Sequence, residues 1–409
     1  MMRVELGTKS TFKVNRLEAL AACLVAVGSN RGDRFELVRQ AVAWLRSDPR
    51  IRSLRVSHLQ ESAAIIGSRG RSEQPASAID DSSAPYLNGA IYFETHLSAQ
   101  AVLDLLLELE SRAGRRRTDR WGSRELDLDL LLYNEMICQT RHLTLPHPRM
   151  VFRRFVLEPA VELAPAWRHP TTGWQLRELL EHQDRTPPYL AICGPRANQL
   201  AIELADWRPL RLVRDPVEEE NPSQAASGSL SRQLDRLQAR LAALAHALAP
   251  GPVAGSSPST SSCVMSDFWL EQTWFDAQQV LERDAFLEFQ SAWRRLEPQM
   301  VWPRLLVFLD SSSSDPPPGI SARYSGPFPC ASSIASHESR SGLVGLEPVD
   351  AGVAEAGPNE YVAGVSPVAM WRQPWFAVAT ADWDWATREL RAAVEAMSRA
   401  PSSIDHRPV

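Results

Sequence analysis

The sequence predicts two consecutive domains, an α+β domain with an antiparallel sheet and then an α/β domain with a parallel sheet. The chain has 409 residues, which is long enough for two separate cores. In the first half, the apolar patterns follow the order strand, helix, strand, strand, helix, strand, which is the split βαβ order with helices packed on one side of the sheet. From about residue 187, strands alternate with helices, and this alternation is typical of a parallel sheet.

The composition is close to that of an average globular protein, with 44% hydrophobic and 23% charged residues. A formal net charge of -5 argues against a general binder of nucleic acid or membrane surfaces, and apolar runs such as 20–27 are too short to span a bilayer. The five cysteines form no metal-type pair, and their odd number favours a reduced, cytoplasmic setting. Residues 1–20 lack a secretion-signal pattern and are expected to be a disordered extension or a misplaced start.

Capping residues and apolar spacing define the elements of the first half. Asp33 can cap the first helix and Ser98 the second, and Gly114 is placed to end the second helix. A polar loop rich in Ser, Gly and Pro, residues 67–85, separates the middle strands. The predicted elements are a strand at 23–27, a helix between Asp33 and Asp48, strands at 52–62 and 86–94, a helix between Ser98 and Gly114, and a strand at 126–133.

The last of these strands alternates strictly between leucine and aspartate. Side chains of a strand point alternately to its two faces, so Asp127 and Asp129 leave one face while Leu126, Leu128 and Leu130 are buried on the other. Two neighbouring carboxylates repel each other unless a cation lies between them, and oxygen ligands suit Mg²⁺. A lone Asp-Leu-Asp would more simply be the solvated face of an edge strand.

Arginines immediately before this strand favour the metal site. Five of them lie within ten residues: Arg115, Arg116, Arg117, Arg120 and Arg124. Guanidinium groups on one side and a metal ion on the other would neutralise a polyphosphate. The pattern therefore indicates metal-phosphate chemistry.

Four blocks of the first half resemble 6-hydroxymethyl-7,8-dihydropterin pyrophosphokinase of folate biosynthesis, in its order and at about its spacing: residues 27–34, 86–88, 120–129 and 145–149. The resemblance covers about residues 22–180. It implies a ferredoxin-like α+β domain without a Walker loop. It also implies an enzyme that transfers the two terminal phosphates of ATP to the hydroxymethyl group of the pterin and releases AMP.

The resemblance also assigns roles to individual residues. Asp127 and Asp129 would hold two Mg²⁺ ions with ATP, and Arg115 and Arg124 would act on the phosphates during catalysis. The pterin would be read by Asn88, whose amide is both donor and acceptor, and sandwiched by Tyr86 and Phe155. The residues that would contact ATP are Glu110, Arg115, Arg120, Trp121, Arg124, His147 and Arg153.

Each assignment has a structural alternative. Tyr86 and Phe155 could be core aromatics, Asn88 a turn residue, His147 a loop histidine and Glu110 a solvated helix charge. Two departures from the family also stand out. The 67–85 loop is longer than expected and the 115–120 run is about one residue short, which bears on rate and affinity more than on the type of reaction.

The second half resembles a deoxynucleoside kinase that has lost its phosphate-binding loop. A strand at 189–193 ends in Gly194-Pro195, but no Gly-Lys-Ser/Thr follows to cradle phosphates. Residues 215–222 resemble the segment of the catalytic carboxylate and 264–268 a later strand, yet the arginine expected afterwards is replaced around Thr273 and Trp274. We therefore expect a degenerate P-loop-kinase-like domain that serves docking or homodimerisation. The alternatives are a working nucleoside kinase here, or a chain that binds nucleotide for regulation without turnover.

The predicted domain boundaries follow from these patterns. We expect the pterin pyrophosphokinase domain at 21–183, a linker at 184–188 and the second domain at 189–400, with disordered stretches near 251–262 and 311–340. Leucines at spacings of four and three from Leu230 to Leu248 predict a packed core helix rather than a coiled-coil dimer, because they cover under three heptads. Further strands at 305–309 and 375–379 and a helix at 384–399 complete the prediction.

Overall fold

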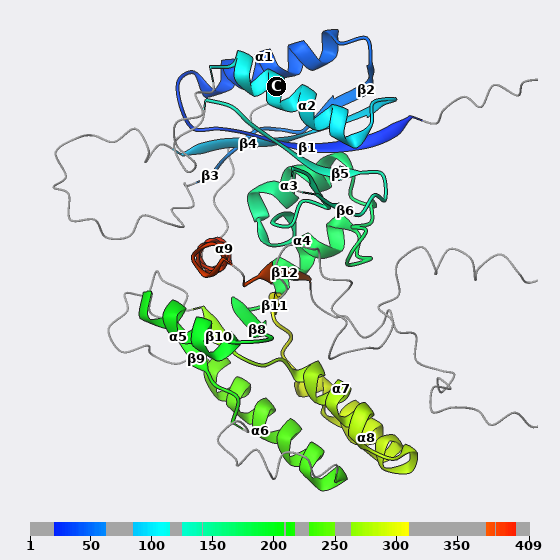
Figure 1. Ribbon diagram of the computed structural model, residues 1–409, viewed down its shortest axis with the longest axis vertical. Coiled ribbons are helices and arrows are strands. Elements are labelled where there is room, and N and C mark those ends of the chain that lie inside the picture. The colour runs from blue at the N-terminus through cyan, green and yellow to red at the C-terminus, as the bar shows by residue number, and fades with distance from the viewer. Residues whose placement is uncertain are drawn as a thin grey trace, which may run out of the picture.

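The computed structural model describes residues 20–62, 85–114, 125–140, 142–207, 210–216, 229–249, 263–310, 374–380 and 382–397. Two five-stranded sheets lie in the described parts, one in each half of the chain (Figure 1). The predicted mixed α/β architecture is therefore confirmed. The stretches expected to be disordered, 251–262 and 311–340, lie outside the described residues, as do residues 1–19. None of the described helices is long and apolar enough to cross a membrane.

The first sheet is antiparallel and has the strand order β2-β4-β1-β5, with β3 also pairing with β4. The expected single strand at 52–62 is wrong in detail, because it is divided into two strands. The pairing with β4 shifts between Arg52 and Arg55, where Ser53 has a positive φ of 51°. The strands are β1 (Ala21–Ser29), β2 (Ile51–Val56), β3 (Gln60–Ser62), β4 (Tyr86–Thr95) and β5 (Asp127–Tyr133).

Two helices cover one face of this sheet, α1 (Arg34–Ser47) and α2 (Ala99–Arg112). The predicted caps are present, since the Asp33 side chain accepts a hydrogen bond from the N–H of Glu36 and that of Ser98 from the N–H of Ala101. Each cap satisfies one of the N–H groups that a helix start leaves without a partner. Gly114 follows α2 with a φ of +100°, which suits glycine and ends the helix.

The opposite face is also covered, so the expectation of helices on one side only is wrong. Below the sheet in Figure 1 lie α3 (Arg154–Leu163) and α4 (Leu176–Arg185), preceded by the short helix η2 (Met150–Phe152). The physical reason is that Leu24 of β1 and Leu132 of β5 point to this face and are fully buried. They belong to the same apolar cluster as Leu157 of α3.

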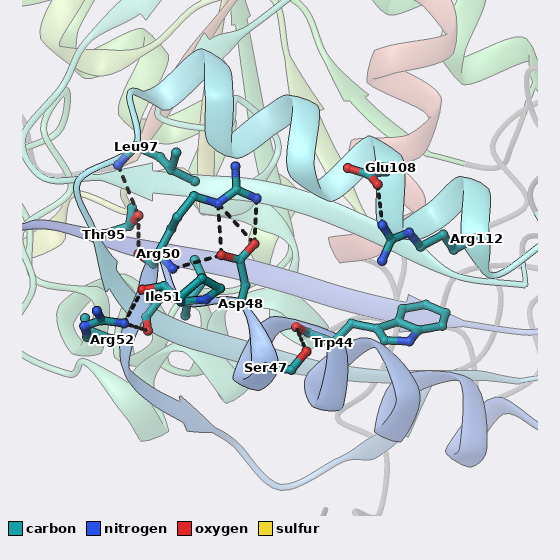
Figure 2. A network of polar contacts seen from close by, with 11 residues as sticks. Trp44, Ser47, Asp48, Arg50, Ile51, Arg52, Thr95, Leu97, Glu108 and Arg112 are labelled. Carbon is teal, nitrogen blue, oxygen red and sulfur yellow. Dashed lines mark hydrogen bonds and ion pairs between the residues drawn. The ribbon is translucent and has the colours of Figure 1, made fainter.

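A polar network fixes one end of the first sheet (Figure 2). The Arg50 guanidinium pairs with Asp48, and the Thr95 hydroxyl donates to the Arg50 carbonyl at 2.8 Å and accepts from the N–H of Leu97 at 3.1 Å. Thr95 is fully buried and pairs with Ala21, the first residue of β1. The network thus holds the end of the sheet opposite Ser29.

The second sheet is parallel and has the order β12-β11-β8-β10-β9. Its strands are β8 (Tyr189–Cys193), β9 (Arg211–Val213), β10 (Val264–Ser266), β11 (Leu305–Asp310) and β12 (Trp375–Ala379). On one face pack α5 (Ala197–Trp207) and α9 (Trp383–Met397). On the other pack α6 (Leu230–Leu248), α7 (Leu270–Val280) and α8 (Arg283–Leu296), the last continuing into the short helix η3 (Glu297–Gln299).

The leucine-rich helix α6 packs within its own chain. Leu237 and Leu244 are at most 1% exposed and belong to one apolar cluster with α7 and α8. This arrangement agrees with the prediction of a core helix.

The two halves share a core. Only Thr186, Pro187 and Pro188 connect α4 to β8. One apolar cluster contains Met150 and Leu157 of the first half together with Leu190 and Leu390 of the second. Because these side chains exclude water jointly, each half contributes to the stability of the other.

Candidate active site at the open end of the first sheet

Two rows of directly opposed residues cross three adjacent strands of the first sheet, β4, β1 and the edge strand β5. In the first row, Gly28 of β1 pairs with Asn88 of β4 on one side and with Asp127 of β5 on the other. In the second row, Ala26 pairs with Ala90 and Asp129. Directly opposed residues share a face of a sheet. The two carboxylates and the Asn88 amide therefore project on the same side.

The leucines of β5 take the other side, as the alternation predicts. Leu126, Leu128 and Leu130 are at most 4% exposed and pack beneath α1 and α2. The strand is thus fixed by apolar burial, and its carboxylates cannot turn to the other face without exposing the leucines.

Small residues separate the polar groups of the two rows. A Cβ atom at Gly28 would lie 3.4 Å from Oδ1 of Asn88, in van der Waals contact with it. The flanking Ala26 and Ala90 carry only a methyl group. No large side chain from β1 therefore rises between the amide and the acids.

Glu110 of α2 lies under this arrangement. It is 2% exposed, and its Oε1 accepts a hydrogen bond from the backbone N–H of Leu128 at 2.9 Å. The alternative of a solvated helix charge is wrong, because the carboxylate is buried against the strand. Its predicted contact with ATP stays a prediction.

His147 comes close to the acidic strand through the loop after β7 (Thr144–Leu145), which pairs with β6 (Cys138–Gln139). Its N–H donates to the Leu131 carbonyl at 2.9 Å, and its Nε2 lies 3.8 Å from Oδ2 of Asp129. Burial lowers the pKa of His147 to about 3, and the nearby Arg153 and Arg149 act in the same direction. The imidazole is therefore neutral at pH 7.

The proton of this imidazole is on Nε2. The backbone N–H of Arg149 donates to Nδ1 of His147 at 3.3 Å, so Nδ1 is the acceptor nitrogen. In a neutral ring the other nitrogen carries the hydrogen. His147 thus presents a donor toward Asp129 and toward any anion held beside it.

Arg153 lies between this loop and α3. Burial lowers its pKa to about 10, Arg149 acts in the same direction, and Asp129 opposes the shift. Its Nε atom is buried and has no hydrogen-bond partner among the described residues. A buried guanidinium N–H without a partner is costly, so this atom is suited to an anionic ligand.

The predicted pterin residues lie around the start of β4. Asn88 is 5% exposed and lies within the strand, so the alternative of a turn residue is wrong. Its Nδ2 donates to the Ser62 hydroxyl at 2.8 Å and to the Tyr86 carbonyl at 3.3 Å. Phe155 lies partly buried on α3, and Gln60, which pairs with Asn88, donates to its carbonyl at 3.4 Å.

The remaining predicted residues, Arg115, Arg120, Trp121 and Arg124, lie outside the described residues, as does all of the 67–85 loop except Pro85. The structure shows how the flanks of these segments are held. The Ser29 hydroxyl donates to the Glu125 carbonyl, and the Arg34 guanidinium donates to the Pro85 carbonyl. Both segments therefore start or end at the rim of the two polar rows.

The two aspartates are predicted to be protein ligands of a metal ion. The described residues contain no group of three or more His, Cys, Asp and Glu side chains that could hold a metal. Mg²⁺ commonly takes one or two carboxylates and completes its shell with water and substrate phosphates. The pair therefore fits Mg²⁺ bound together with a polyphosphate rather than a closed structural metal site.

Sequence reasoning missed three residues at this site. Ser62 and Gln60 lie beside Asn88 because β3 pairs with β4, and the irregular pattern of residues 52–62 gave no such register. Arg149 belongs to the predicted loop, but its partner Glu389 lies 240 positions away. No local pattern could have joined those two.

Comparison with known proteins identifies the family. The family model described as 7,8-dihydro-6-hydroxymethylpterin-pyrophosphokinase (HPPK) matches residues 24–165. The chain is 38% identical over 139 residues to 2-amino-4-hydroxy-6-hydroxymethyldihydropteridine pyrophosphokinase of Bacillus subtilis, which covers 34% of this chain and 75% of that protein. The chain belongs to the HPPK family. The family resemblance predicted from four sequence blocks is thus confirmed.

Other relatives extend the match to different lengths. The HPPK of Pseudomonas aeruginosa is 36% identical over 156 residues, 38% of this chain and 88% of that protein. The HPPK of Synechocystis sp. is 42% identical over 101 residues, and the chain spans about half of its length, 52%, and 25% of its own. A crystal structure titled HPPK-DHPS in complex with substrates has a TM-score of 0.30 at 10% identity, over 72% of this chain and 76% of that one, which is too low to relate the folds over that length.

Proposed function

We propose that this chain transfers a pyrophosphoryl group from ATP to 6-hydroxymethyl-7,8-dihydropterin, releasing AMP, as a step of folate biosynthesis. One observation carries the proposal. In a chain of the HPPK family, the paired carboxylates Asp127 and Asp129 share a sheet face with Asn88 and lie beside His147. Relatives named pyrophosphokinases support the same reaction.

Asp127 and Asp129 would hold Mg²⁺, two ions with ATP in the proposal. Bound there, the ions would neutralise the triphosphate and favour ionisation of the attacking hydroxyl. The fit rests on two oxygen donors that leave one face, with the Asp129 side chain 37% exposed. Phosphoryl transfer needs little covalent catalysis by the protein. The residues of the site would therefore act by positioning the substrates and by neutralising charge.

His147 and Arg153 would hold the phosphates. The Nε2–H of the neutral His147 can donate to a phosphate oxygen, and so can the Nε–H of Arg153, which has no hydrogen-bond partner among the described residues. Arg115 and Arg124 would close over the triphosphate as catalytic arginines, with Arg120, Trp121 and Glu110 at the nucleotide.

Asn88 would form hydrogen bonds with the pterin, and Tyr86 and Phe155 would stack against its ring. Both hydrogens of Nδ2 are engaged, by Ser62 and by the Tyr86 carbonyl. Oδ1 is thus left as an acceptor for an N–H of the pterin. The amide is held on two sides, so its orientation is set before the ligand binds.

The test is an assay of AMP release by the intact chain with ATP, Mg²⁺ and 6-hydroxymethyl-7,8-dihydropterin. Asp127→Ala should abolish the pterin-dependent signal, because a lost metal contact worth several kcal/mol lowers the rate by about a hundredfold or more. Asp104→Ala, an exposed carboxylate of α2, is the control and should keep the wild-type rate. AMP release without pterin, or unchanged release by Asp127→Ala, would refute the proposal.

For the second half we infer a non-catalytic, P-loop-kinase-like domain at 189–400, following a ferredoxin-like domain predicted at 21–183. Of the linker predicted at 184–188, residues 186–188 lie between α4 and β8. Arg240 supports this inference. It is 1% exposed, pairs through Nε and Nη2 with both oxygens of Asp215, and donates from Nη1 to the Thr273 hydroxyl. Asp215 begins the segment that resembles the base of nucleoside kinases, and here both of its oxygens accept hydrogen bonds from Arg240.

A phosphate-transfer assay tests this part. The intact chain should not phosphorylate deoxynucleosides with ATP, and detectable nucleoside monophosphate would restore the alternative of a working kinase. The proposed role is docking or homodimerisation, which light scattering of the purified chain would reveal as a dimer mass. The proposed location is the cytoplasm, in line with the free thiols of Cys23, Cys138 and Cys193 in the described part of the chain.

A further inference from the structure

A buried ion pair connects the second half of the chain to the candidate active site. Glu389 of α9 is 3% exposed, and its two oxygens accept hydrogen bonds from Nε of Arg149, at 2.6 Å, and from Nη2 of the same residue. The Arg149 side chain is 24% exposed. A bidentate pair of this kind fixes the plane of the guanidinium as well as its position.

Arg149 belongs to the loop that carries the phosphate-facing groups. Its backbone N–H donates to Nδ1 of His147, and four residues later the chain reaches Arg153. Between them, η2 packs against α9, and Met150 and Phe152 share an apolar cluster with Leu390 and Ala393 of that helix. In Figure 1, α9 lies between the helices beneath the first sheet and the strands of the second.

Charge explains why this pair bears on the site. The positive charge of Arg149 lowers the pKa of Arg153. The negative charges of Asp129, Glu389 and Asp127 raise it. Without Glu389, Arg149 would lose this ion pair, while Asp127 and Asp129 would still act on Arg153 of the same loop. A guanidinium that pairs with the aspartates would compete directly with a metal ion.

We propose that Glu389 is a positioning residue for the nucleotide site: by holding Arg149 in a bidentate pair, it keeps the loop of His147 and Arg153 in place and keeps Arg149 away from the metal-binding carboxylates. The proposal rests on the proposed function of the first half. It gives the second half a role in MgATP binding although that half has no phosphate-binding loop of its own.

The test uses the full-length chain with Glu389→Gln, which keeps the size of the side chain and removes its charge. We expect KM for MgATP to rise by about three- to thirtyfold, the range of a coupling between distant parts of a protein. KM for the pterin should stay within twofold, because Asn88 and Tyr86 are held by other contacts. Binding of a non-hydrolysable ATP analogue with Mg²⁺, measured by calorimetry, should weaken by the same factor.

The matched control is Glu203→Gln. Glu203 of α5 accepts hydrogen bonds from the Trp383 indole at the start of the same helix α9. This substitution also removes a carboxylate that contacts α9, but at Trp383, six residues or roughly 9 Å along the helix from Glu389. It should leave KM for MgATP unchanged even if the melting temperature falls.

A double mutant separates positioning from general destabilisation. If Glu389 acts through Arg149, then Glu389→Gln should change KM for MgATP by less than twofold in an Arg149→Gln background. An unchanged KM in the single variant, equal effects of Glu203→Gln, or additive effects in the double mutant would each overturn the proposal. If the wild-type chain releases no AMP, the proposed function fails, and the calorimetric comparison still decides whether Glu389 supports nucleotide binding.

Discussion

Glu110 of α2 accepts a hydrogen bond at 2.9 Å from the backbone N–H of Leu128, the residue between the two aspartates. The carboxylate is 2% exposed, so the contact is shielded from water. It joins the helix on one face of the sheet to the strand whose carboxylates leave the other face. The position of the acidic pair therefore depends on a group that lies on the opposite side of the strand.

Substitutions of Glu110 should distinguish this role from contact with ATP. Glu110→Gln keeps an acceptor for the Leu128 N–H and should retain most activity. Glu110→Leu leaves that N–H buried without a partner and should lower the free energy of unfolding by about 1–3 kcal/mol, with a fall in kcat. Urea unfolding and steady-state kinetics measure both. A large rise in KM for ATP in Glu110→Gln would instead favour direct contact with the nucleotide.

Gly28 should be intolerant of a side chain. Gly28→Val adds three carbons beside Oδ1 of Asn88, where even a Cβ would lie at 3.4 Å, so overpacking of about 1–3 kcal/mol is expected. We predict a rise of about tenfold in KM for the pterin, corresponding to roughly 1.4 kcal/mol. The control is Ala22→Val on the same face of β1, six residues or roughly 20 Å away. Equal kinetics of the two variants would contradict a pterin site at Asn88.

His169 should make the protein less stable in acid. It is 4% exposed, its Nδ1 accepts from the N–H of Thr172, and burial lowers its pKa to about 3 from the ordinary value of 6.5. Between these pH values the unfolded chain binds more protons, so stability falls as pH decreases, by up to about 1.4 kcal/mol per pH unit.

The variant that tests this is His169→Asn, which can still accept from Thr172. Its free energy of unfolding in urea should fall less steeply between pH 6 and pH 4 than that of the wild type. His142→Asn, which removes an exposed histidine, is the control substitution. Parallel pH profiles of wild type and His169→Asn would refute the prediction. His147 and His182 act in the same direction, because their pKa values are also lowered.

Removal of the second half should destabilise the first. Met150, Val151 and Phe152 are each at most 2% exposed, and they share one apolar cluster with Leu390. A chain ending at residue 186 would leave these side chains in water, so we expect a lower melting temperature and binding of a hydrophobic dye. Differential scanning fluorimetry of both chains measures this. A melting temperature equal to that of the intact chain would show that the shared cluster adds no stability.

Patterns of short range made much of this protein predictable. The alternation of Leu126 to Leu130 with two aspartates gave the faces of β5, and the caps Asp33 and Ser98 gave the starts of two helices. The covered second face was missed, because α3 follows the sheet in the sequence and nothing local shows where it packs. The burial of Glu110 was missed for the same reason. The sequence of a helix is the same whether one of its charged residues faces water or packs against a strand.

The sequence by itself determined the family, the antiparallel and parallel sheets and the set of candidate site residues, because these depend on local periodicity and on motifs in order. The tertiary structure alone decided that Gly28 lies between Asn88 and Asp127, and that Glu389 pairs with Arg149 across 240 positions. Strand register and the docking of α9 are set by the burial of many apolar groups at once. This collective contribution to the free energy of folding cannot be inferred from the residue at any single position.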